Sequence, residues 1–405
     1  MEHFKYDVLK VREEFPVFYK NPSLIYFDSA ATSHKPKRVV DTMTRFLLEE
    51  YGTVHRAVYE LAAGATARYN EVRNSLKQFI GAGEEGDVVF TRGTTDGINL
   101  VAASFGKAFL KEGDEILISE TEHHSNIVPW QLICEEKKAV LRVIPVDDQG
   151  ELCLDLFEKM LSSKTKLVSI AHISNATGVL HPIVDIIELS HKYGAKVLID
   201  AAQSASHIPL KVKEWDVDFL VFSGHKIYGP TGIGVLYGKK DLLNQMPPYQ
   251  GGGDMVQQVS FEKTTYQEAP LKFEAGTPSI AEVMGLGSAI EFLNQWGLDK
   301  IHKHESILME SAVKHLEQIP QVSFLSHSNN KSSILTFSCK GIHSLDIGTL
   351  LDLEGIAVRT GHLCAQPTLK RFGIRSAIRI SFGAYNQLEE VERFMIAFKG
   401  VLKSL

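Results

Sequence analysis

Polar and ionisable side chains gather at the ends of five short apolar runs of this chain. The runs are DVVFT (87–91), EILIS (115–119), KLVSIAHI (166–173), KVLID (196–200) and DFLVFS (218–223). The residues that end or follow them include Thr94, Thr95, His123, Asn175, Asp200, Gln203, Ser223, His225 and Lys226. Ligands of open α/β sheets bind beyond the carboxyl ends of the strands. We therefore expect these hydroxyls, amides, imidazoles, carboxylate and amine to share one rim of a sheet.

The combination suits the chemistry of pyridoxal phosphate. This cofactor needs a lysine for its Schiff base and a carboxylate that keeps its ring nitrogen protonated, and Lys226 and Asp200 are the candidates. Thr94 and Thr95 begin a predicted helix, where free N–H groups and the helix dipole favour a phosphate. His123 can lie flat against the ring. Each residue alone has a simpler interpretation, such as a helix cap or a solvated lysine, so the prediction rests on the set.

Cys364 is the cysteine whose surroundings favour reactivity. It lies in the glycine-containing segment RTGHLCAQP (359–367). His362, Arg359 or Arg379 could lower the pKa of its thiol. A buried, inert thiol is the alternative. The other three cysteines are predicted to be structural: Cys134, Cys153 and Cys339.

Arg379 is a candidate for binding a substrate carboxylate. It lies between two isoleucines in the β-like run SAIRISF (376–382). A guanidinium so flanked usually has a bidentate carboxylate partner. We expect that partner to be the substrate, and a surface ion pair is the alternative.

The elements that must position these residues change in character along the chain. Up to about residue 260, the apolar runs alternate with helical patterns, which predicts strands buried on both faces of a mainly parallel sheet. Beyond that point, the pattern predicts helices over 280–296, 301–318 and 389–402 and strands over 322–325 and 333–338. We therefore predict an α/β fold with a smaller α+β domain.

The bulk composition argues against several classes of protein. The 405 residues carry a formal net charge of −6, so neither nucleic acid nor a membrane surface is expected as a partner. The four cysteines form no C-x-x-C pair, which argues against zinc and a disulfide framework; no metal is expected. The opening residues MEHFKYDVLKVREEF lack the apolar stretch of a signal peptide, which favours a cytoplasmic location.

At these residues, the sequence resembles the class V aminotransferase-like pyridoxal-phosphate enzymes, and among them the Suf-type (group II) cysteine desulfurase and selenocysteine lyase family. The resemblance runs from about Tyr26 to the C-terminus. It is carried by seven segments in order: YFDSAAT (26–32), TRGTTDGINL (91–100), EHHSNIVP (122–129), DAAQS (200–204), SGHKIYG (223–229), KFEAGTP (272–278) and RTGHLCAQP (359–367).

The resemblance implies a fold and a domain division. The fold is the type I fold of pyridoxal-phosphate-dependent transferases, with a mainly parallel seven-stranded sheet between helices. Residues 25–290 would form the large cofactor-binding domain. Residues 1–24 and 291–405 would form the small α+β domain that carries the cysteine loop.

The resemblance also implies roles for the matching residues. Lys226 would form the Schiff base and move the α-proton, and Asp200 would pair with the ring nitrogen. Gln203 would bind the ring hydroxyl, and His123 would stack on the ring and assist proton transfer. The phosphate would be held by Thr95, Ser223 and His225, with Thr94 as a neighbour in the same turn and Thr277 reaching it from the second subunit of a homodimer. The substrate site would contain Asn175, Arg379 and Arg359. His55 and Arg56 would lie near the active site of the partner subunit and contribute to substrate binding there.

The activity implied by the resemblance is desulfuration of L-cysteine to L-alanine, with a persulfide formed on Cys364. The sulfur would pass to an acceptor protein of the Suf system for iron–sulfur cluster assembly. Selenocysteine lyase or cysteine sulfinate desulfinase activity is the alternative, and an aminotransferase or a non-catalytic scaffold are more remote ones. Three positions depart from the family pattern: Leu363, Ala57 and Tyr59.

Overall fold

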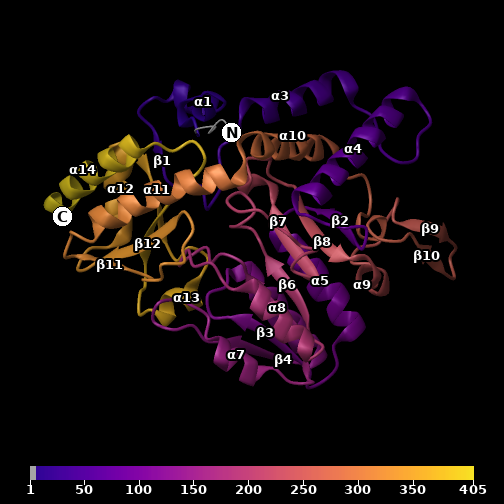
Figure 1. Cartoon of the computed structure of the whole chain (residues 1–405). Helices are drawn as coiled ribbons and strands as arrows, with labels where there is room; N and C mark the ends of the chain where they lie inside the picture. The colour runs from indigo at the N-terminus through magenta and orange to yellow at the C-terminus, as the bar shows by residue number, and fades with distance from the viewer. Residues whose placement is uncertain (1–5) are drawn as a thin grey trace.

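A seven-stranded sheet forms the centre of the molecule in the computed structural model, which describes residues 6–405 (Figure 1). The strand order is β2-β8-β7-β6-β5-β3-β4. Only β8 runs antiparallel to the other strands of this sheet, between β2 and β7. The strands are β2 (Gly86–Thr91), β3 (Glu115–Ser119), β4 (Val140–Ile144), β5 (Thr165–Ala171), β6 (Lys196–Asp200), β7 (Phe219–Ser223) and β8 (Gly234–Lys239). The predicted α/β class with a mainly parallel seven-stranded sheet is confirmed.

Two strands of this sheet were not predicted from the sequence, and each has a physical reason. The edge strand β4 (VLRVI) contains a charged residue and is partly exposed, so it lacks the apolar run of a buried strand. The antiparallel strand β8 (GVLYGK) contains two glycines, which weaken a strand pattern. Both strands are instead stabilised by backbone pairing, β4 with β3 and β8 with β2 and β7.

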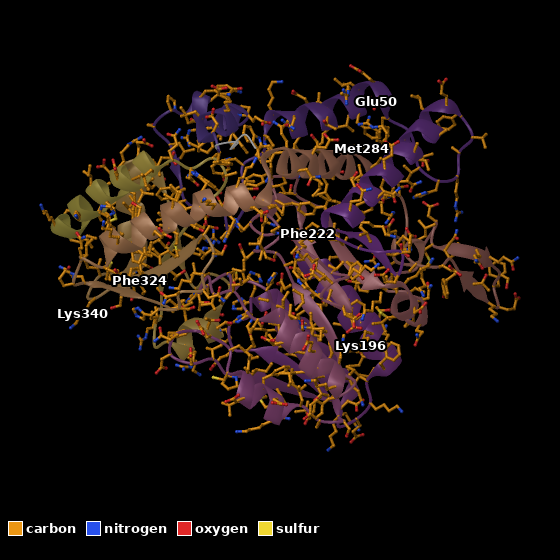
Figure 2. The ribbon with its side chains drawn as sticks, viewed as in Figure 1. Glu50, Lys196, Phe222, Met284, Phe324 and Lys340 are labelled. Carbon is orange, nitrogen blue, oxygen red and sulfur yellow. The ribbon has the colours of Figure 1, made fainter. Side chains whose placement is uncertain are left out.

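Helices cover both faces of the sheet. Consecutive residues of a strand point to opposite faces of the sheet. In β6, Leu198 packs in one apolar cluster and Ile199 in another, so each face has its own cluster. In Figure 2, Phe222 of β7 and Met284 of α10 lie inside the molecule, and both belong to the larger cluster. The helices around the sheet are α3 (Lys37–Arg45), α4 (Glu60–Phe79), α5 (Thr94–Phe109), α6 (Val128–Lys137), α7 (Leu154–Met160), α8 (Ile183–Lys192), α9 (Lys240–Gln245) and α10 (Ile280–Trp296).

A second, antiparallel sheet lies beside the first, in the order β11-β12-β15-β14. Its strands are β11 (Val322–Phe324), β12 (Ile334–Cys339), β14 (Arg359–Gly361) and β15 (Ala377–Ser381). The helices of this part are α11 (Leu298–Leu316), α12 (Ser344–Leu353), α13 (Gln366–Arg371) and α14 (Leu388–Ser404). The apolar faces of α11, α12 and α14 form a third cluster with the sheet, whereas Leu369 of α13 packs in a smaller one. The predicted α+β character of the C-terminal part is therefore present.

The N-terminal segment contacts both parts. Phe15 and Phe18, from the segment of α1 (Val8–Glu13) and α2 (Pro16–Lys20), pack in the cluster of the large sheet. The short strand β1 (Ile25–Tyr26) instead pairs in parallel with β13 (Ile356–Ala357). The division into 25–290 and 1–24 plus 291–405 stays a prediction, and residues 1–5 of it lie outside the described residues.

Short elements complete the chain. A π-helical turn at Phe46–Glu50 extends α3, and β9 (Val256–Val259) and β10 (Thr264–Tyr266) form a hairpin that projects from the body (Figure 1). Three 3-10 turns lie at His124–Asn126, Gly224–Lys226 and Leu271–Phe273. Over residues 6–405, no helix combines the length and the apolar character needed to cross a membrane.

A buried ion pair attaches the segment after Leu271–Phe273 to α4. The guanidinium of Arg73 binds both carboxylate oxygens of Glu274, at 2.7 and 2.8 Å, and Glu274 also accepts the Phe90 N–H at 2.8 Å. We expect Glu274→Gln to lower the free energy of unfolding by about 3 kcal/mol, because it leaves a buried guanidinium without its charge partner. Chemical denaturation measures this change. The exposed Glu71→Gln on the same helix should change stability by less than about 0.5 kcal/mol, and equal effects of the two changes would contradict the prediction.

Candidate active site

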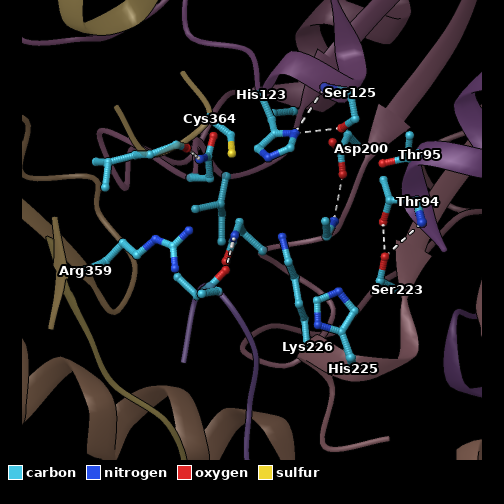
Figure 3. A pocket seen from close by; sticks show the side chains of 18 of the residues that line it. Thr94, Thr95, His123, Ser125, Asp200, Ser223, His225, Lys226, Arg359 and Cys364 are labelled. Carbon is cyan, nitrogen blue, oxygen red and sulfur yellow. Dashed lines mark hydrogen bonds between the residues drawn. The ribbon is translucent and has the colours of Figure 1, made fainter. Parts of the chain in front are cut away.

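The carboxyl ends of the parallel strands open onto a cavity of about 230 Å³ (Figure 3). The structure brings most of the predicted site residues to its wall. They come from β3, β5, β6 and β7, from the start of α5, and from the C-terminal part of the chain. These residues are Thr94, Thr95, His123, Asn175, Asp200, Gln203, Ser223, His225, Lys226, Arg359, Cys364 and Arg379.

Lys226 reaches the cavity from the 3-10 turn that directly follows β7. The turn needs glycine at position 224, because a Cβ there would lie 2.8 Å from the Ile233 side chain and 3.0 Å from the Pro230 carbonyl oxygen. The pKa of the Lys226 amine is lowered to about 8, chiefly by burial; the charge of Asp200 opposes this shift and the charge of Arg379 adds to it. About a tenth of the amine is therefore uncharged and nucleophilic at neutral pH, far more than for an ordinary lysine.

Asp200 ends β6 and is buried on the same cavity. One of its oxygens accepts the Ala202 N–H at 2.9 Å. Burial raises the pKa of its carboxyl group, although this N–H and the charge of Lys226 lower it. A protonated ring nitrogen beside Asp200 would stabilise the charged carboxylate. Gln203 donates its amide N–H to the Ala30 carbonyl oxygen at 2.9 Å, which leaves its amide oxygen for another partner.

An anion cradle lies where β2 leads into α5. Gly93 precedes the helix with a φ of 151° and has no side chain that could cap the helix. The hydroxyl of Ser223 contacts the Thr94 N–H at 2.8 Å and the Thr94 hydroxyl at 2.7 Å, which joins β7 to the helix start. The N–H groups of a first helical turn favour a phosphate. Burial and the charge of Lys226 lower the pKa of the adjacent His225 to about 4, so its ring is neutral.

His123 is held in one tautomer. Its Nδ1 accepts the Ser125 backbone N–H at 3.1 Å and also contacts the Ser125 hydroxyl at 2.8 Å (Figure 3). Because a backbone N–H can only donate, the neutral ring carries its proton on Nε2. Burial, followed by the charge of Lys226, lowers the pKa of His123 to about 3. The ring is therefore a neutral Nε2–H donor on the cavity wall.

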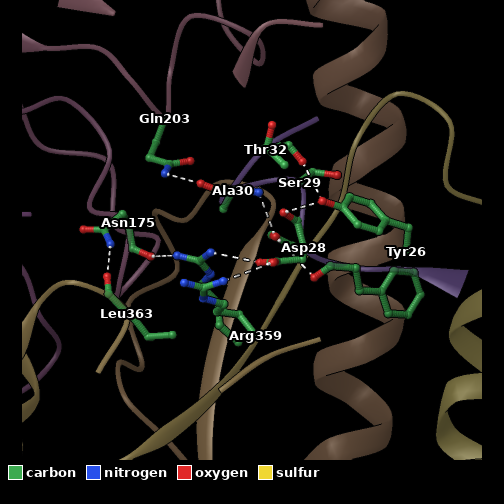
Figure 4. Close-up of polar contacts among 12 residues, drawn as sticks. Tyr26, Asp28, Ser29, Ala30, Thr32, Asn175, Gln203, Arg359 and Leu363 are labelled. Carbon is green, nitrogen blue, oxygen red and sulfur yellow. Dashed lines mark hydrogen bonds and ion pairs between the residues drawn. The ribbon is translucent and has the colours of Figure 1, made fainter. Parts of the chain in front are cut away.

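Arg379 is buried on β15 and shares a carboxylate with Arg359 (Figure 4). One of its nitrogens donates to Asp28 at 3.2 Å and another to the Asn175 carbonyl oxygen at 3.0 Å, whereas its buried Nε has no partner among the described residues. The half-exposed Arg359 lies 4.0 Å from the same Asp28. Arg379 thus has a carboxylate partner within the protein, Asp28, and its guanidinium retains a donor for a further carboxylate; its predicted binding of a substrate carboxylate stays a prediction.

The sequence interpretation missed three residues that hold this site. Asp28 pairs with Arg379, Ser125 orients His123, and the buried Glu122 accepts the Ala171 N–H and the Asn126 amide, at 3.0 and 2.7 Å respectively. Asp28 directly follows the apolar run IYF (25–27), and a carboxylate at the end of such a run could have marked it as a candidate. Ser125 and Glu122 lie next to the predicted histidine pair, but adjacency alone does not reveal such contacts.

Cys364 lies in a short loop between β14 and α13, and its thiol is exposed. Its carbonyl oxygen accepts the His124 N–H at 2.9 Å, and the Leu363 carbonyl accepts the Asn175 amide at 2.7 Å. Both Leu363 and Cys364 adopt positive φ angles, of 56° and 53°, which are uncommon for such residues. The Leu363 side chain is buried in an apolar cluster with Leu369. The packing of the Leu363 side chain therefore helps to fix the position of the loop.

Three predicted site residues lie away from this cavity. Thr277 lines a different cavity, together with Arg92. His55 is not part of the cavity wall; it has a φ of 76°, and its backbone N–H donates to the Thr66 hydroxyl at 2.9 Å. Arg56 pairs with Asp254 at 2.9 Å. Their contributions were predicted to cross a dimer interface, so these roles stay predictions.

Comparisons with known proteins agree with this geometry. The family model described as aminotransferase class-V matches residues 25–394. A probable cysteine desulfurase of Mycolicibacterium paratuberculosis is 47% identical over 99% of this chain, which spans 59% of the length of that relative. A cysteine desulfurase of Escherichia coli O7:K1 is 44% identical over 99% of both chains. The solved apo structure of a cysteine desulfurase from Thermococcus onnurineus NA1 superposes with a TM-score of 0.94, at 38% identity, over 98% of both chains. The chain therefore belongs to the aminotransferase class-V family.

Proposed function

We propose that this protein is a cysteine desulfurase that converts L-cysteine to L-alanine and keeps the sulfur on Cys364. The observation that carries the proposal is the exposed Cys364 thiol on the wall of the cavity that also contains the Lys226 amine. A class V aminotransferase that transfers amino groups has no need of a thiol there. The names of the similar proteins support the same activity.

Pyridoxal phosphate is the cofactor that the residues fit. The weakly basic amine of Lys226 suits a Schiff base, and Asp200 would face the ring nitrogen. The start of α5 with Thr94, Thr95 and Ser223, together with His225, would hold the phosphate. When bound, the cofactor withdraws electrons from the α-carbon of an amino acid and so labilises the bonds at that carbon and at Cβ.

The chain's own residues then divide the remaining work. Arg379, with a free buried Nε, would bind the substrate carboxylate, with Asn175 and Arg359 beside it. The uncharged amine of Lys226 can take up the α-proton, and the Nε2–H of His123 can donate a proton. Cys364, as a thiolate, attacks the substrate sulfur; an S–S bond forms, the Cβ–S bond breaks with its electron pair passing to the carbon that becomes alanine, and the sulfur stays on Cys364 as a persulfide.

The proposed homodimer is supported by exposed apolar side chains on the Phe46–Glu50 turn, the 51–59 loop and the β9–β10 hairpin. Leu48 is 79% exposed, Val58 is fully exposed, and Phe261 at the tip of the β9–β10 hairpin is fully exposed. Arg56 binds Asp254 and the Val256 carbonyl, which joins the 51–59 loop to the hairpin. A second copy would cover these side chains. Assignment to the Suf-type group, transfer to a Suf acceptor, and a cytoplasmic location belong to the same proposal.

Replacing the proposed sulfur acceptor tests the function most directly. With L-cysteine and dithiothreitol, we expect Cys364→Ala to lower the formation of alanine and sulfide at least roughly hundredfold, because no thiolate remains to attack the substrate sulfur. Turnover of L-selenocysteine should survive, since its leaving group departs more readily. The half-buried Cys153→Ala, outside the cavity, should behave as the wild type. Unchanged L-cysteine turnover by Cys364→Ala would refute the persulfide, and release of a keto acid would identify an aminotransferase.

The lowered pKa of Lys226 predicts how the apoprotein captures its cofactor. Only the uncharged amine condenses with an aldehyde, so the rate should rise with pH around a midpoint near 8, well below the ordinary lysine value of 10.5. Asp200→Asn should move this midpoint to lower pH, because it removes a charge that raises the Lys226 pKa. Stopped-flow absorbance after mixing with pyridoxal phosphate measures both. Asp241→Asn, exposed on α9, should leave the midpoint unchanged; a midpoint near 10 in the wild type would contradict the proposed environment.

The dimer surface can be tested by placing charges on it. We expect the double change Val58→Glu and Phe261→Glu to convert a dimer into a monomer, because buried unpaired carboxylates oppose association. Light scattering during size-exclusion chromatography gives the mass. Ile396→Glu alters a side chain that is 75% exposed on α14 and should leave the dimer intact. A wild type with the mass of one chain, or a double variant that remains dimeric, would refute this surface.

A further inference from the structure

A groove runs beside the Cys364 loop that the proposed chemistry of the cavity does not use. It lies along α13 and the turn that follows it, and its volume is about 520 Å³. His362 and Gln366 line the end nearest to Cys364 in sequence, and Lys370 and Arg375 line the remainder. In Figure 1, α13 lies on the opposite side of the molecule from the β9–β10 hairpin. The groove is therefore distinct from the proposed dimer surface.

The groove is positively charged, although the chain as a whole is acidic. Lys370 and Arg375 are exposed, and neither has a carboxylate partner among residues 6–405. Their neighbour Arg371, by contrast, pairs with Asp148 at 2.9 Å and with Glu120 at 3.5 Å. The net charge of the whole chain is −6. Two unpaired cations on such a protein create a local field that attracts anionic partners.

The floor of the groove is apolar. Leu369 is buried, Ile374 is half-buried, and both belong to the cluster that also contains Leu363 of the cysteine loop. An apolar floor with cations along it suits a peptide segment that carries both an apolar side chain and carboxylates. A small free thiol would make no use of either feature.

The cysteine loop is fastened to its surroundings, so an acceptor must come to the thiol. His124 binds the Cys364 carbonyl oxygen through its backbone N–H at 2.9 Å, and its Nε2 accepts the Gln366 N–H at 3.1 Å. The Asn175 amide holds the Leu363 carbonyl at 2.7 Å. These contacts fix Cys364 relative to α13. A partner bound in the groove would therefore meet the thiol in a constant geometry.

We propose that this groove docks a sulfur-accepting protein through a segment in which carboxylates flank the accepting cysteine. The inference rests on the proposed persulfide at Cys364. The acceptor thiolate attacks the terminal sulfur of that persulfide, a new S–S bond forms, and the S–S bond to Cys364 breaks. Cys364 leaves as a thiolate. One S–S bond replaces another, so the transfer needs no oxidant or reductant.

Synthetic cysteine peptides test the charge preference. Three peptides of equal length carry one cysteine flanked by four glutamates, four serines or four lysines. We expect the persulfide sulfur of the wild type to move to the glutamate peptide roughly tenfold faster than to the serine peptide at low ionic strength, and slowest to the lysine peptide. High salt should reduce the difference, since it screens exposed charges. Mass spectrometry of the peptide persulfides gives the rates.

The double variant Lys370→Glu and Arg375→Glu should lose this preference, with transfer to the glutamate peptide falling about tenfold. The matched control is Lys399→Glu with Lys403→Glu, which makes the same charge change at exposed positions of α14. Equal transfer to all three peptides, or equal losses in both double variants, overturns the docking proposal. Sulfide release with dithiothreitol should stay unchanged in both variants. Failure of the wild type to release sulfide would instead refute the proposed desulfurase function.

Discussion

A lysine amine can act as a nucleophile near neutral pH only where its surroundings disfavour its charge, and the whole site is arranged around that constraint. Lys226 meets it by leaving the sheet on a tight turn that buries the amine at the strand ends. The same burial disfavours the negative charge of Asp200, which is balanced by the Ala202 N–H and by Lys226 itself. The charge of each side chain thus partly offsets the cost of burying the charge of the other.

A second set of contacts joins the two parts of the molecule at this cavity. Asp28 follows β1, whereas Arg359 and Arg379 belong to the C-terminal sheet, and their ion pairs meet at the cavity wall. Asn175, beyond β5, holds the carbonyl oxygen of Leu363, one residue before the thiol. The amine of the large sheet and the thiol of the C-terminal part therefore keep a defined relation. This relation is what a reaction that moves sulfur from substrate to protein requires.

The loop of Cys364 contains two consecutive residues with positive φ, Leu363 and Cys364. Two consecutive residues with positive φ are costly for side chains with a Cβ, and the surrounding contacts must compensate. Leu363 buries its side chain against Leu369, and His124 binds the backbone on both sides of Ala365. The loop is consequently short and fixed, with the thiol exposed. The cationic groove along α13 begins where this loop ends.

Local patterns in the sequence were enough to predict most of the parallel strands, the C-terminal α+β character and most of the residues around the cavity. This succeeded because the carboxyl ends of parallel strands converge, so that residues after successive strands must meet. Local patterns were not enough for β4 and β8, whose pairing depends on neighbouring strands. They were also not enough for Asp28, whose partners lie more than 300 residues away. The sequence by itself determined which chemical groups are present and which rim they share; the tautomer of His123, the charge state of Lys226 and the fastening of Cys364 were decided only by the tertiary structure, because burial and long-range hydrogen bonds arise only when distant segments pack together.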